Sequence, residues 1–157
     1  MSTLYATFQV AGHVRGIDVL GVQEVLREQR LTPVPLAPGV VEGLINLRGQ
    51  IVPAVDLRRV LKLAPAEPER GRFSVVARSP HGPVSLQVDE IGDVVDPEAA
   101  AFEATPQGVD PAVASFLRGV YQLKDRLLLV LDTARATEIV PAAHSAANRS
   151  QHDAKAE

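Results

Sequence analysis

The chain has 157 residues, and its 16 Lys and Arg against 19 Asp and Glu give a formal net charge of −3. This charge balance argues against binding of nucleic acid through a basic surface. Cysteine is absent, which excludes disulfides, thiolate zinc sites and a cysteine nucleophile. No apolar run is long enough to span a membrane, and the first residues lack the pattern of a signal peptide, so we expect a soluble cytoplasmic protein.

The first predicted element is a hairpin with strands at Tyr5–Val10 and His13–Val19, because both segments alternate apolar and polar residues. A second hairpin is predicted over residues 44–55, with Arg48–Gly49 at its turn. Pro53 cannot donate a backbone hydrogen bond. The second strand of this hairpin therefore lies at an edge there, or turns its nitrogen away from its neighbour.

A short helix is predicted next. Asp56 can cap a helix over Leu57–Leu63, which Pro65 ends. Further along the chain, Phe73–Ala77 and Val84–Val88 alternate in the same way as the first hairpin and predict another.

The sequence also contains an internal repeat. Gly43–Asp56 aligns without a gap with Gly119–Asp132, which predicts a second hairpin of the same kind and a helix from Thr133 to Ile139. Ile17–Val25 aligns in a similar way with Leu86–Val94. This duplication favours two small β-barrels packed side by side. The last residues, 141–157, are small and polar, and we expect them to be disordered.

Little in the sequence is suited to catalysis. The four histidines have no partner at the spacing of metal ligands, so no metal site is predicted: His13, His81, His144 and His152. A phosphate-binding loop and a nucleophile elbow are both missing, and no cofactor is expected. The carboxylates of Asp89 and Glu90 are interpreted as a turn after a strand, with a small enzyme that uses the pair as an alternative.

We therefore expect the protein to act through its surface. Arg48 stands at a hairpin tip, where it is either a solvated turn residue or a directional contact for a carboxylate of a partner. Glu24 lies in an apolar strand and allows the same two interpretations. Gly43 and Gly49 are interpreted as positions of positive φ or of close backbone approach.

Several of these motifs resemble the CheW-like domain family. Four stretches carry the resemblance, in the order of the family: Gly16–Val25, Pro38–Leu57, Val88–Val95 and Asp125–Asp132. The most specific part is Asn46–Gly49 with the segment that follows it. The resemblance covers about residues 4 to 138.

The resemblance implies a fold and a function. The fold would be mainly β, with two SH3-like five-stranded β-barrel subdomains and short helices in a domain over residues 1–140. Its intertwined halves would cover roughly residues 15–65 and 84–138. The function would be that of a non-enzymatic adaptor in a bacterial chemosensory array. Its partners would be the cytoplasmic tip of chemoreceptors, the regulatory domain of a CheA-type histidine kinase and other CheW-like subunits. An SH3-like barrel that binds another partner such as RNA is the alternative.

The resemblance also implies the residues that bind receptor or kinase. This predicted set is Val22, Glu24, Gly43, Leu44, Asn46, Leu47, Arg48 and Gly49. We expect a groove edged by Val22, Leu44 and Leu47 to receive the apolar stripe of a receptor helix. Arg48 and Glu24 would then set the register of that helix.

Overall fold

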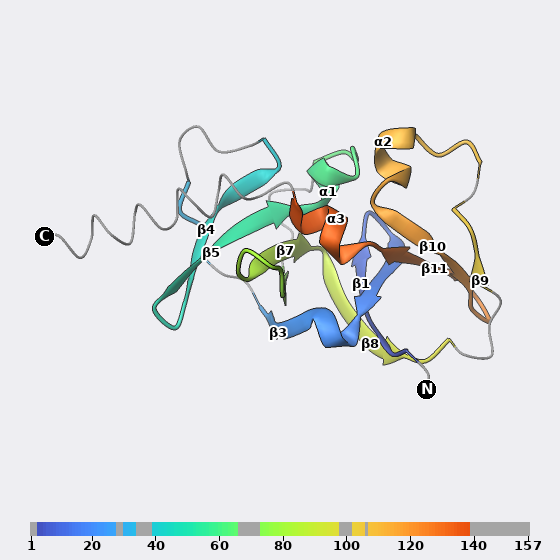
Figure 1. Ribbon diagram of the computed structural model, residues 1–157, viewed down its shortest axis with the longest axis horizontal. Coiled ribbons are helices and arrows are strands. Elements are labelled where there is room, and N and C mark those ends of the chain that lie inside the picture. The colour runs from blue at the N-terminus through green and yellow to red at the C-terminus, as the bar shows by residue number, and fades with distance from the viewer. Residues whose placement is uncertain are drawn as a thin grey trace, which may run out of the picture.

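The computed structural model describes residues 3–27, 30–33, 39–65, 73–97, 102–105 and 107–138 (Figure 1). The predicted tail, residues 141–157, lies outside these residues. The strands are β1 (Tyr5–Val10), β2 (His13–Asp18), β3 (Val22–Leu26), β4 (Val41–Leu47), β5 (Gln50–Asp56), β6 (Phe73–Ala77), β7 (Val84–Val88), β8 (Glu90–Val95), β9 (Phe102–Glu103), β10 (Leu117–Gln122) and β11 (Leu127–Leu131). Short helical segments connect or follow them: η1 (Val19–Gly21), α1 (Leu57–Val60), α2 (Pro111–Ala114) and α3 (Thr133–Glu138).

The predicted elements agree closely with these bounds, and two differences have a local cause. β2 ends one residue before the predicted end, because the side chain of Asp18 accepts a hydrogen bond from the backbone of Leu20 and starts η1. The helix predicted over Leu57–Leu63 ends at Val60. Lys62 adopts a left-handed conformation with φ of 57°, and the N–H of Leu63 donates to the carbonyl of Arg58 at 2.7 Å. These contacts form a helix-terminating Schellman motif.

The strands form two sheets that share one topology. The six-stranded sheet has the order β8-β1-β2-β11-β10-β9, and the five-stranded sheet has the order β3-β6-β7-β5-β4. Each sheet contains a parallel pair at the equivalent place, β2 with β11 and β5 with β7. A bridge between Thr32 and Leu44 lies where β9 lies in the six-stranded sheet. The mainly β fold in two similar units is therefore confirmed, although the pairings among the described residues do not close either sheet into a barrel.

Each sheet takes its strands from both repeats. The hairpin β1–β2 pairs with β8 and β11 of the second repeat, whereas β6–β7 pairs with β3 and β5 of the first. Within the described residues, the chain crosses from one sheet to the other at η1 and again at Asp89. The two repeats are thus interleaved, and the boundary between the sheets does not follow the boundary between the repeats.

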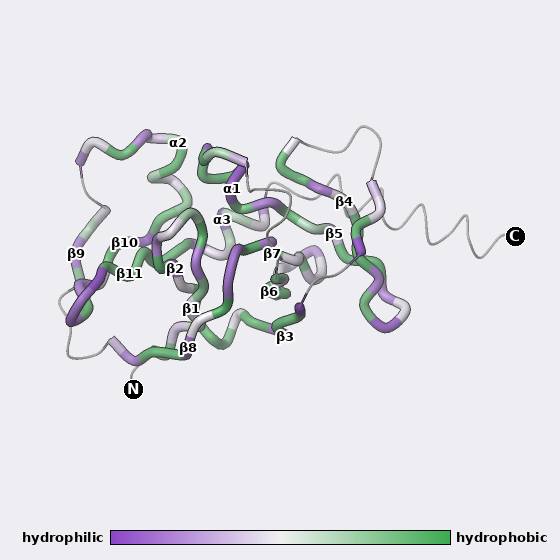
Figure 2. Tube along the Cα trace, turned by 180° about the vertical axis from the view of Figure 1, so that it is seen from behind, coloured by the Kyte–Doolittle hydropathy of each residue, from purple (hydrophilic) through white to green (hydrophobic). Residues whose placement is uncertain are grey.

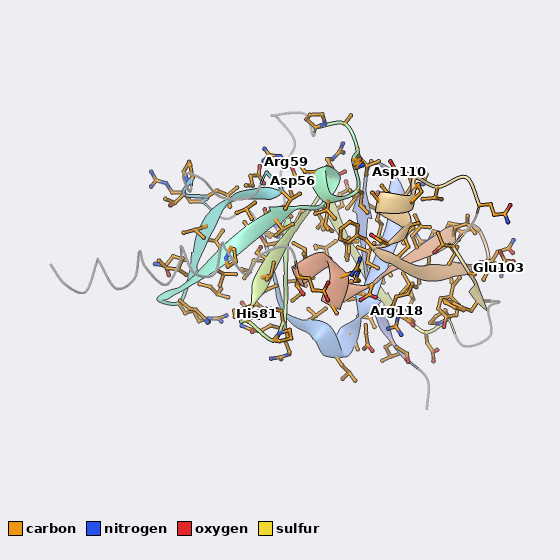
Figure 3. The ribbon with its side chains drawn as sticks, turned by 45° about the horizontal axis from the view of Figure 1, so that its top comes forward. Asp56, Arg59, His81, Glu103, Asp110 and Arg118 are labelled. Atoms are coloured by element: carbon orange, nitrogen blue, oxygen red, sulfur yellow. The ribbon has the colours of Figure 1, made fainter. Side chains whose placement is uncertain are left out.

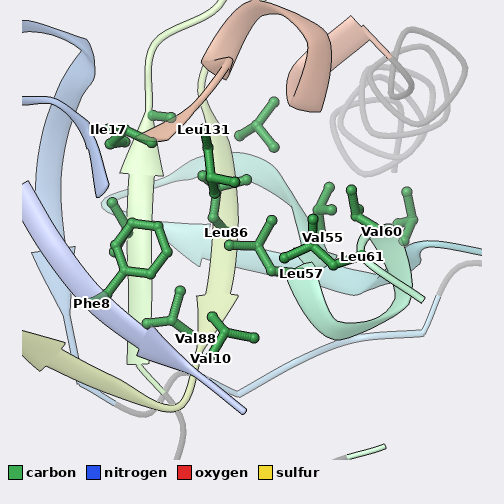
Figure 4. Packing of buried hydrophobic residues seen from close by; sticks show 14 residues of the cluster. Phe8, Val10, Ile17, Val55, Leu57, Val60, Leu61, Leu86, Val88 and Leu131 are labelled. Atoms are coloured by element: carbon green, nitrogen blue, oxygen red, sulfur yellow. The ribbon is translucent and has the colours of Figure 1, made fainter. Parts of the chain in front are cut away.

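The main hydrophobic core lies between the two sheets and includes α1 (Figure 4). Its buried members are Phe8, Val10, Ile17, Val41, Val55, Leu57, Val60, Leu61, Val75, Ala77, Val84, Leu86, Val88 and Leu131. Burying one such aliphatic or aromatic side chain fully is worth about 1.5–3 kcal/mol. This shared core is therefore the main attraction that holds the sheets together.

Two smaller clusters lie on the other faces of the sheets. One cluster belongs to the five-stranded sheet: Ile45, Leu47, Val52, Ala54 and Val76. The other belongs to the six-stranded sheet: Tyr5, Val14, Leu128 and Val130. Because successive residues of a strand point to opposite faces, several strands contribute both to the main core and to one outer cluster: β1, β2, β4, β5, β6 and β11.

Candidate partner-binding site

The tip of the β4–β5 hairpin is a tight two-residue turn. Arg48 has φ of 52° and Gly49 has φ of 86°, the conformation of a type I′ hairpin turn. The side chain of Asn46 accepts a hydrogen bond from the backbone N–H of Gly49 at 2.8 Å. Asn46 and Gly49 therefore shape the turn, and the turn presents the side chain of Arg48.

Arg48 forms a two-pronged ion pair with Glu24. The two Nη atoms of Arg48 donate to the two Oε atoms of Glu24 at 2.6 and 2.8 Å. The Arg48 side chain is 74% exposed and that of Glu24 is 18% exposed. The hydrogen-bonded Glu24 carboxylate holds the pKa of Arg48 above its usual value.

This ion pair joins the two edges of the five-stranded sheet. Glu24 lies in β3 at one edge, and Arg48 follows β4 at the other. The sheet must therefore curl until its edges approach each other. Both residues belong to the predicted binding set, but nothing in the local sequence around either of them indicates that they meet.

Gly43 has a structural role in the same hairpin. A Cβ at this position would lie 2.7 Å from the carbonyl oxygen of Thr32. Leu44 exchanges two backbone hydrogen bonds with Thr32, both of 2.8 Å. Of the two interpretations that the sequence allowed for each glycine, close backbone approach applies to Gly43 and positive φ applies to Gly49.

The three residues expected to edge an apolar groove are largely covered. Leu44 and Leu47 are each 7% exposed, and Leu47 packs in the outer cluster of the five-stranded sheet. Val22 is partly buried and packs against the main core. Of the predicted set, Asn46, Arg48 and Gly49 are the exposed members.

An open pocket lies elsewhere, between the edge strands of the two sheets. It has a volume of about 520 Å³ and is lined by Val25, Leu26, Arg27, Phe73, Glu90 and Ile91. Its lining comes mainly from β3 at one edge of the five-stranded sheet and β8 at one edge of the six-stranded sheet. Figure 2 shows apolar residues along β3 and part of β8 in this region.

The predicted set did not include any residue of this lining. Val25 and Ile91 are large apolar residues that remain 44% and 36% exposed. The sequence did contain a signal for these two positions. Val25 lies in the first of the two segments that align as a repeat, Ile17–Val25, and Ile91 lies in the second, Leu86–Val94. Their proximity depends on how the two sheets pack, which the repeat alone does not specify.

The carboxylates of the alternative enzyme hypothesis have different environments. Asp89 is 8% exposed and accepts hydrogen bonds from Arg58 and from the backbone of Ala11. Glu90 is exposed and lines the pocket. The arrangement gives Asp89 a structural role and leaves Glu90 as a charge at the pocket.

The charged groups near the helices also have structural partners. Asp56 and Asp110 accept hydrogen bonds from the first turns of α1 and α2, at 2.9 and 2.8 Å. Both lie beside these helices in Figure 3, with Arg59 next to Asp56.

In the described part of the chain, His, Cys, Asp and Glu do not gather in any group of three or more suited to a metal ion. No helix among the described residues is long and apolar enough to cross a membrane.

Comparisons with known proteins agree on one family. The family model of the CheW-like domain matches residues 4–139. The chain is 31% identical over 130 residues to the chemotaxis protein CheW of Treponema pallidum, which covers 80% of this chain and 76% of that protein. It is 31% identical over 126 residues to CheW of Bacillus subtilis, with 80% of each chain covered.

A solved structure is also similar. The crystal structure of the scaffolding protein TtCheW from Thermoanaerobacter tengcongensis matches with a TM-score of 0.74 and 24% sequence identity. The match covers 85% of this chain and 91% of that one. At this identity the likeness concerns the fold.

Proposed function

The chain belongs to the CheW-like domain family and is a chemotaxis scaffold protein; we propose that it is the adaptor that couples chemoreceptors to a CheA-type histidine kinase. It would do no chemistry and would act in the cytoplasm, where receptor tips and kinase assemble into an array. An adaptor of this kind holds two partners at once. It therefore needs two surfaces that do not overlap.

The observation that carries the proposal is the open pocket between β3 and β8. Val25, Phe73 and Ile91 offer apolar surface there, beside the opposite charges of Arg27 and Glu90. A helix with an apolar stripe and charged flanks fits such a surface, with its apolar side chains in the pocket. The cytoplasmic tip of a chemoreceptor would be the helical partner.

The Arg48–Glu24 ion pair is suited to set the register of that helix. Glu24 and Val25 are neighbours on β3, so one faces Arg48 while the other faces the pocket. Glu24 takes two N–H donors of Arg48, and the guanidinium has further donors on its exposed side. These donors are available to a carboxylate or carbonyl of the receptor.

A second surface for the kinase is offered at the opposite edge of the six-stranded sheet. β9 forms that edge, and β8 forms the edge at the pocket. Phe102 in β9 and Leu127 in β11 are each 52% exposed. The regulatory domain of the kinase would dock there without covering the pocket. Each contact can be weak, because an array repeats it many times.

Calorimetry with purified components tests the proposal. The chain is titrated with the kinase regulatory domain and with a soluble receptor tip fragment, both from the organism that encodes it. We expect saturable one-to-one binding of each partner in the micromolar range or tighter, and binding of both together. Failure to bind either partner would contradict the adaptor function, and salt-sensitive binding of RNA instead would support the alternative.

Two reciprocal variants assign the surfaces and control for each other. Ile91→Glu puts a charge into the pocket and should weaken binding of the receptor fragment at least tenfold, with kinase binding unchanged. Phe102→Glu should weaken kinase binding and leave receptor binding unchanged. If both variants weaken both partners equally, the two surfaces are not separate.

A further inference from the structure

Asp89 occupies a special place in the topology. It is the single residue between β7 of the five-stranded sheet and β8 of the six-stranded sheet. Its side chain is 8% exposed. The residues that follow it, Glu90 and Ile91, line the pocket. Any rotation of the chain at Asp89 would therefore move one wall of the pocket against the other.

The carboxylate of Asp89 accepts hydrogen bonds from residues that adjoin each of the two sheets. Arg58 in α1 donates from Nε to Oδ1 at 3.1 Å and from Nη2 to Oδ2 at 2.6 Å. The backbone N–H of Ala11, at the β1–β2 turn, donates to Oδ2 at 2.8 Å. The backbone N–H of Asp89 donates to the carbonyl of Gln9 in β1 at 2.9 Å. α1 follows directly from β5 of the five-stranded sheet, whereas Ala11 and Gln9 belong to the six-stranded one.

Arg58 is itself held in place. Its side chain is 11% exposed, and its Nη1 donates to the carbonyl of Ala64 at 2.8 Å. A two-pronged pair of guanidinium and carboxylate has a fixed geometry, which a lysine or a single contact does not reproduce. Because the pair is buried, breaking it would leave charged groups that water cannot easily solvate. The loss of either partner therefore costs free energy.

We propose that the Arg58–Asp89 ion pair fixes the angle between the two sheets and thereby the shape of the pocket between β3 and β8. Both residues are positioning residues, since neither of them lines the pocket, whereas Glu90 and Ile91, which follow Asp89, do. The effect on receptor binding rests on the proposed function. The effect on the angle between the sheets does not.

The angle can be measured without any partner. Residual dipolar couplings of backbone amides report the orientation of each sheet in the full chain. In Asp89→Asn, we expect each sheet to keep its internal structure while the couplings of the two sheets no longer fit the wild-type relative orientation. The wild-type orientation in this variant would overturn the proposal. If Asp89→Asn does not fold, the same measurement on Arg58→Lys decides in the same way.

Arg59 provides a matched control on the same helix. It forms an ion pair with Asp56 at 3.5 Å and donates to the carbonyl of Gly39 at 2.9 Å. Asp56 ends β5 and Gly39 precedes β4, so both partners adjoin the five-stranded sheet and neither links it to the other sheet. Arg59→Met should leave the orientation of the sheets unchanged. Val76→Ala, in the outer cluster of the five-stranded sheet, controls for a general loss of stability. An equal change of orientation in either control would overturn a specific role of the Arg58–Asp89 pair.

Receptor binding gives the second readout. We expect Asp89→Asn to bind the soluble receptor tip fragment at least fivefold more weakly, and Arg59→Met to bind it within twofold of wild type. If the wild-type chain does not bind the fragment but the sheets still reorient in Asp89→Asn, the proposed function fails and the positioning role is supported. Unchanged affinity in a reoriented variant would overturn the link between the angle and the pocket.

Discussion

The β4–β5 hairpin and the β10–β11 hairpin are two versions of one sequence pattern, and they share their structural residues. Gly43 and Gly119 occupy equivalent positions at which a neighbouring segment crosses closely. A Cβ would lie 2.7 Å from the carbonyl oxygen of Thr32 in the first case and 2.7 Å from that of Glu103 in the second. The duplication thus preserved the backbone packing that both sheets need.

The tips of the two hairpins differ. Arg48 lies in a tight turn and pairs with Glu24 across the five-stranded sheet. Lys124 stands at the equivalent position, in a turn that is closed by a hydrogen bond from the backbone N–H of Leu123 to the carbonyl of Arg126 at 2.8 Å and in which Lys124 does not have the positive φ of Arg48. None of the described residues forms an ion pair with Lys124. The feature that distinguishes the first hairpin is therefore an exposed arginine with directed hydrogen bonds, as expected for a binding surface.

The largest expected effect on stability comes from replacing the two equivalent glycines with alanine. Gly43→Ala and Gly119→Ala should each lower the free energy of unfolding by about 1–3 kcal/mol, because the added methyl group overlaps backbone atoms. The loss should be greater at Gly119, where the ring of Phe102 is also close. Urea denaturation measures both.

Gly21→Ala is the control for these variants. No heavy atom lies within 4 Å of a Cβ at Gly21. Its free energy of unfolding should stay close to that of the wild type. A similar loss in all three variants would mean that close approach is not the cause.

The next largest effect is expected on receptor affinity, from charge reversal at the tips of the two hairpins. Arg48→Glu should weaken binding of the receptor fragment about tenfold, because it removes the ion pair and reverses the exposed charge. Lys124→Glu makes the same charge change on the other hairpin and should alter this affinity less than twofold. Both variants should keep the thermal unfolding transition. Loss of that transition in Arg48→Glu would refute the assignment of Arg48 to the surface.

A smaller effect is expected at the helix caps that end the two hairpins. Asp56 is 5% exposed and accepts from the backbone of Arg58 at 2.9 Å, whereas Asp132 accepts from that of Arg135 at 3.2 Å. Asp56→Ala should therefore lower the free energy of unfolding by about 1–2 kcal/mol, and Asp132→Ala by about 0.5 kcal/mol. Equal losses in denaturation would show that burial does not strengthen the first cap.

The smallest effect concerns Asp110, which joins the two repeats through its ion pair with Lys62 at 3.6 Å. The hydrogen bond from the backbone of Ala112, with a smaller contribution from Lys62, holds the pKa of Asp110 below its usual value. A lowered pKa in the folded state stabilises the protein above the unfolded pKa of about 3.9 and loses this effect as the pH falls through the folded value. Asp110→Asn should thus be slightly less stable than wild type at about pH 7, with a difference that disappears in strong acid. A difference that persists there would point to a cause other than charge.

Much of the fold follows from local patterns in the sequence. Alternation of apolar and polar residues placed β1, β6 and β7 at their observed bounds, because a strand with one face in the core repeats every two residues. Asp56 indicated the start of α1 in the same local way. The repeat predicted two similar units. Gly43 and Gly49 were each interpreted as a position of positive φ or of close approach, and the structure shows close approach at Gly43 and positive φ at Gly49.

The tertiary structure alone decided how these pieces combine. The exchange of strands between the repeats, the meeting of Arg48 with Glu24, and the pocket at Val25 and Ile91 all join residues that are distant along the chain. Periodicity specifies which face of a strand is apolar, but it does not specify which strand lies beside it. That choice depends on the packing of the main core between the two sheets, where the free energy of burial is shared by residues from the whole chain.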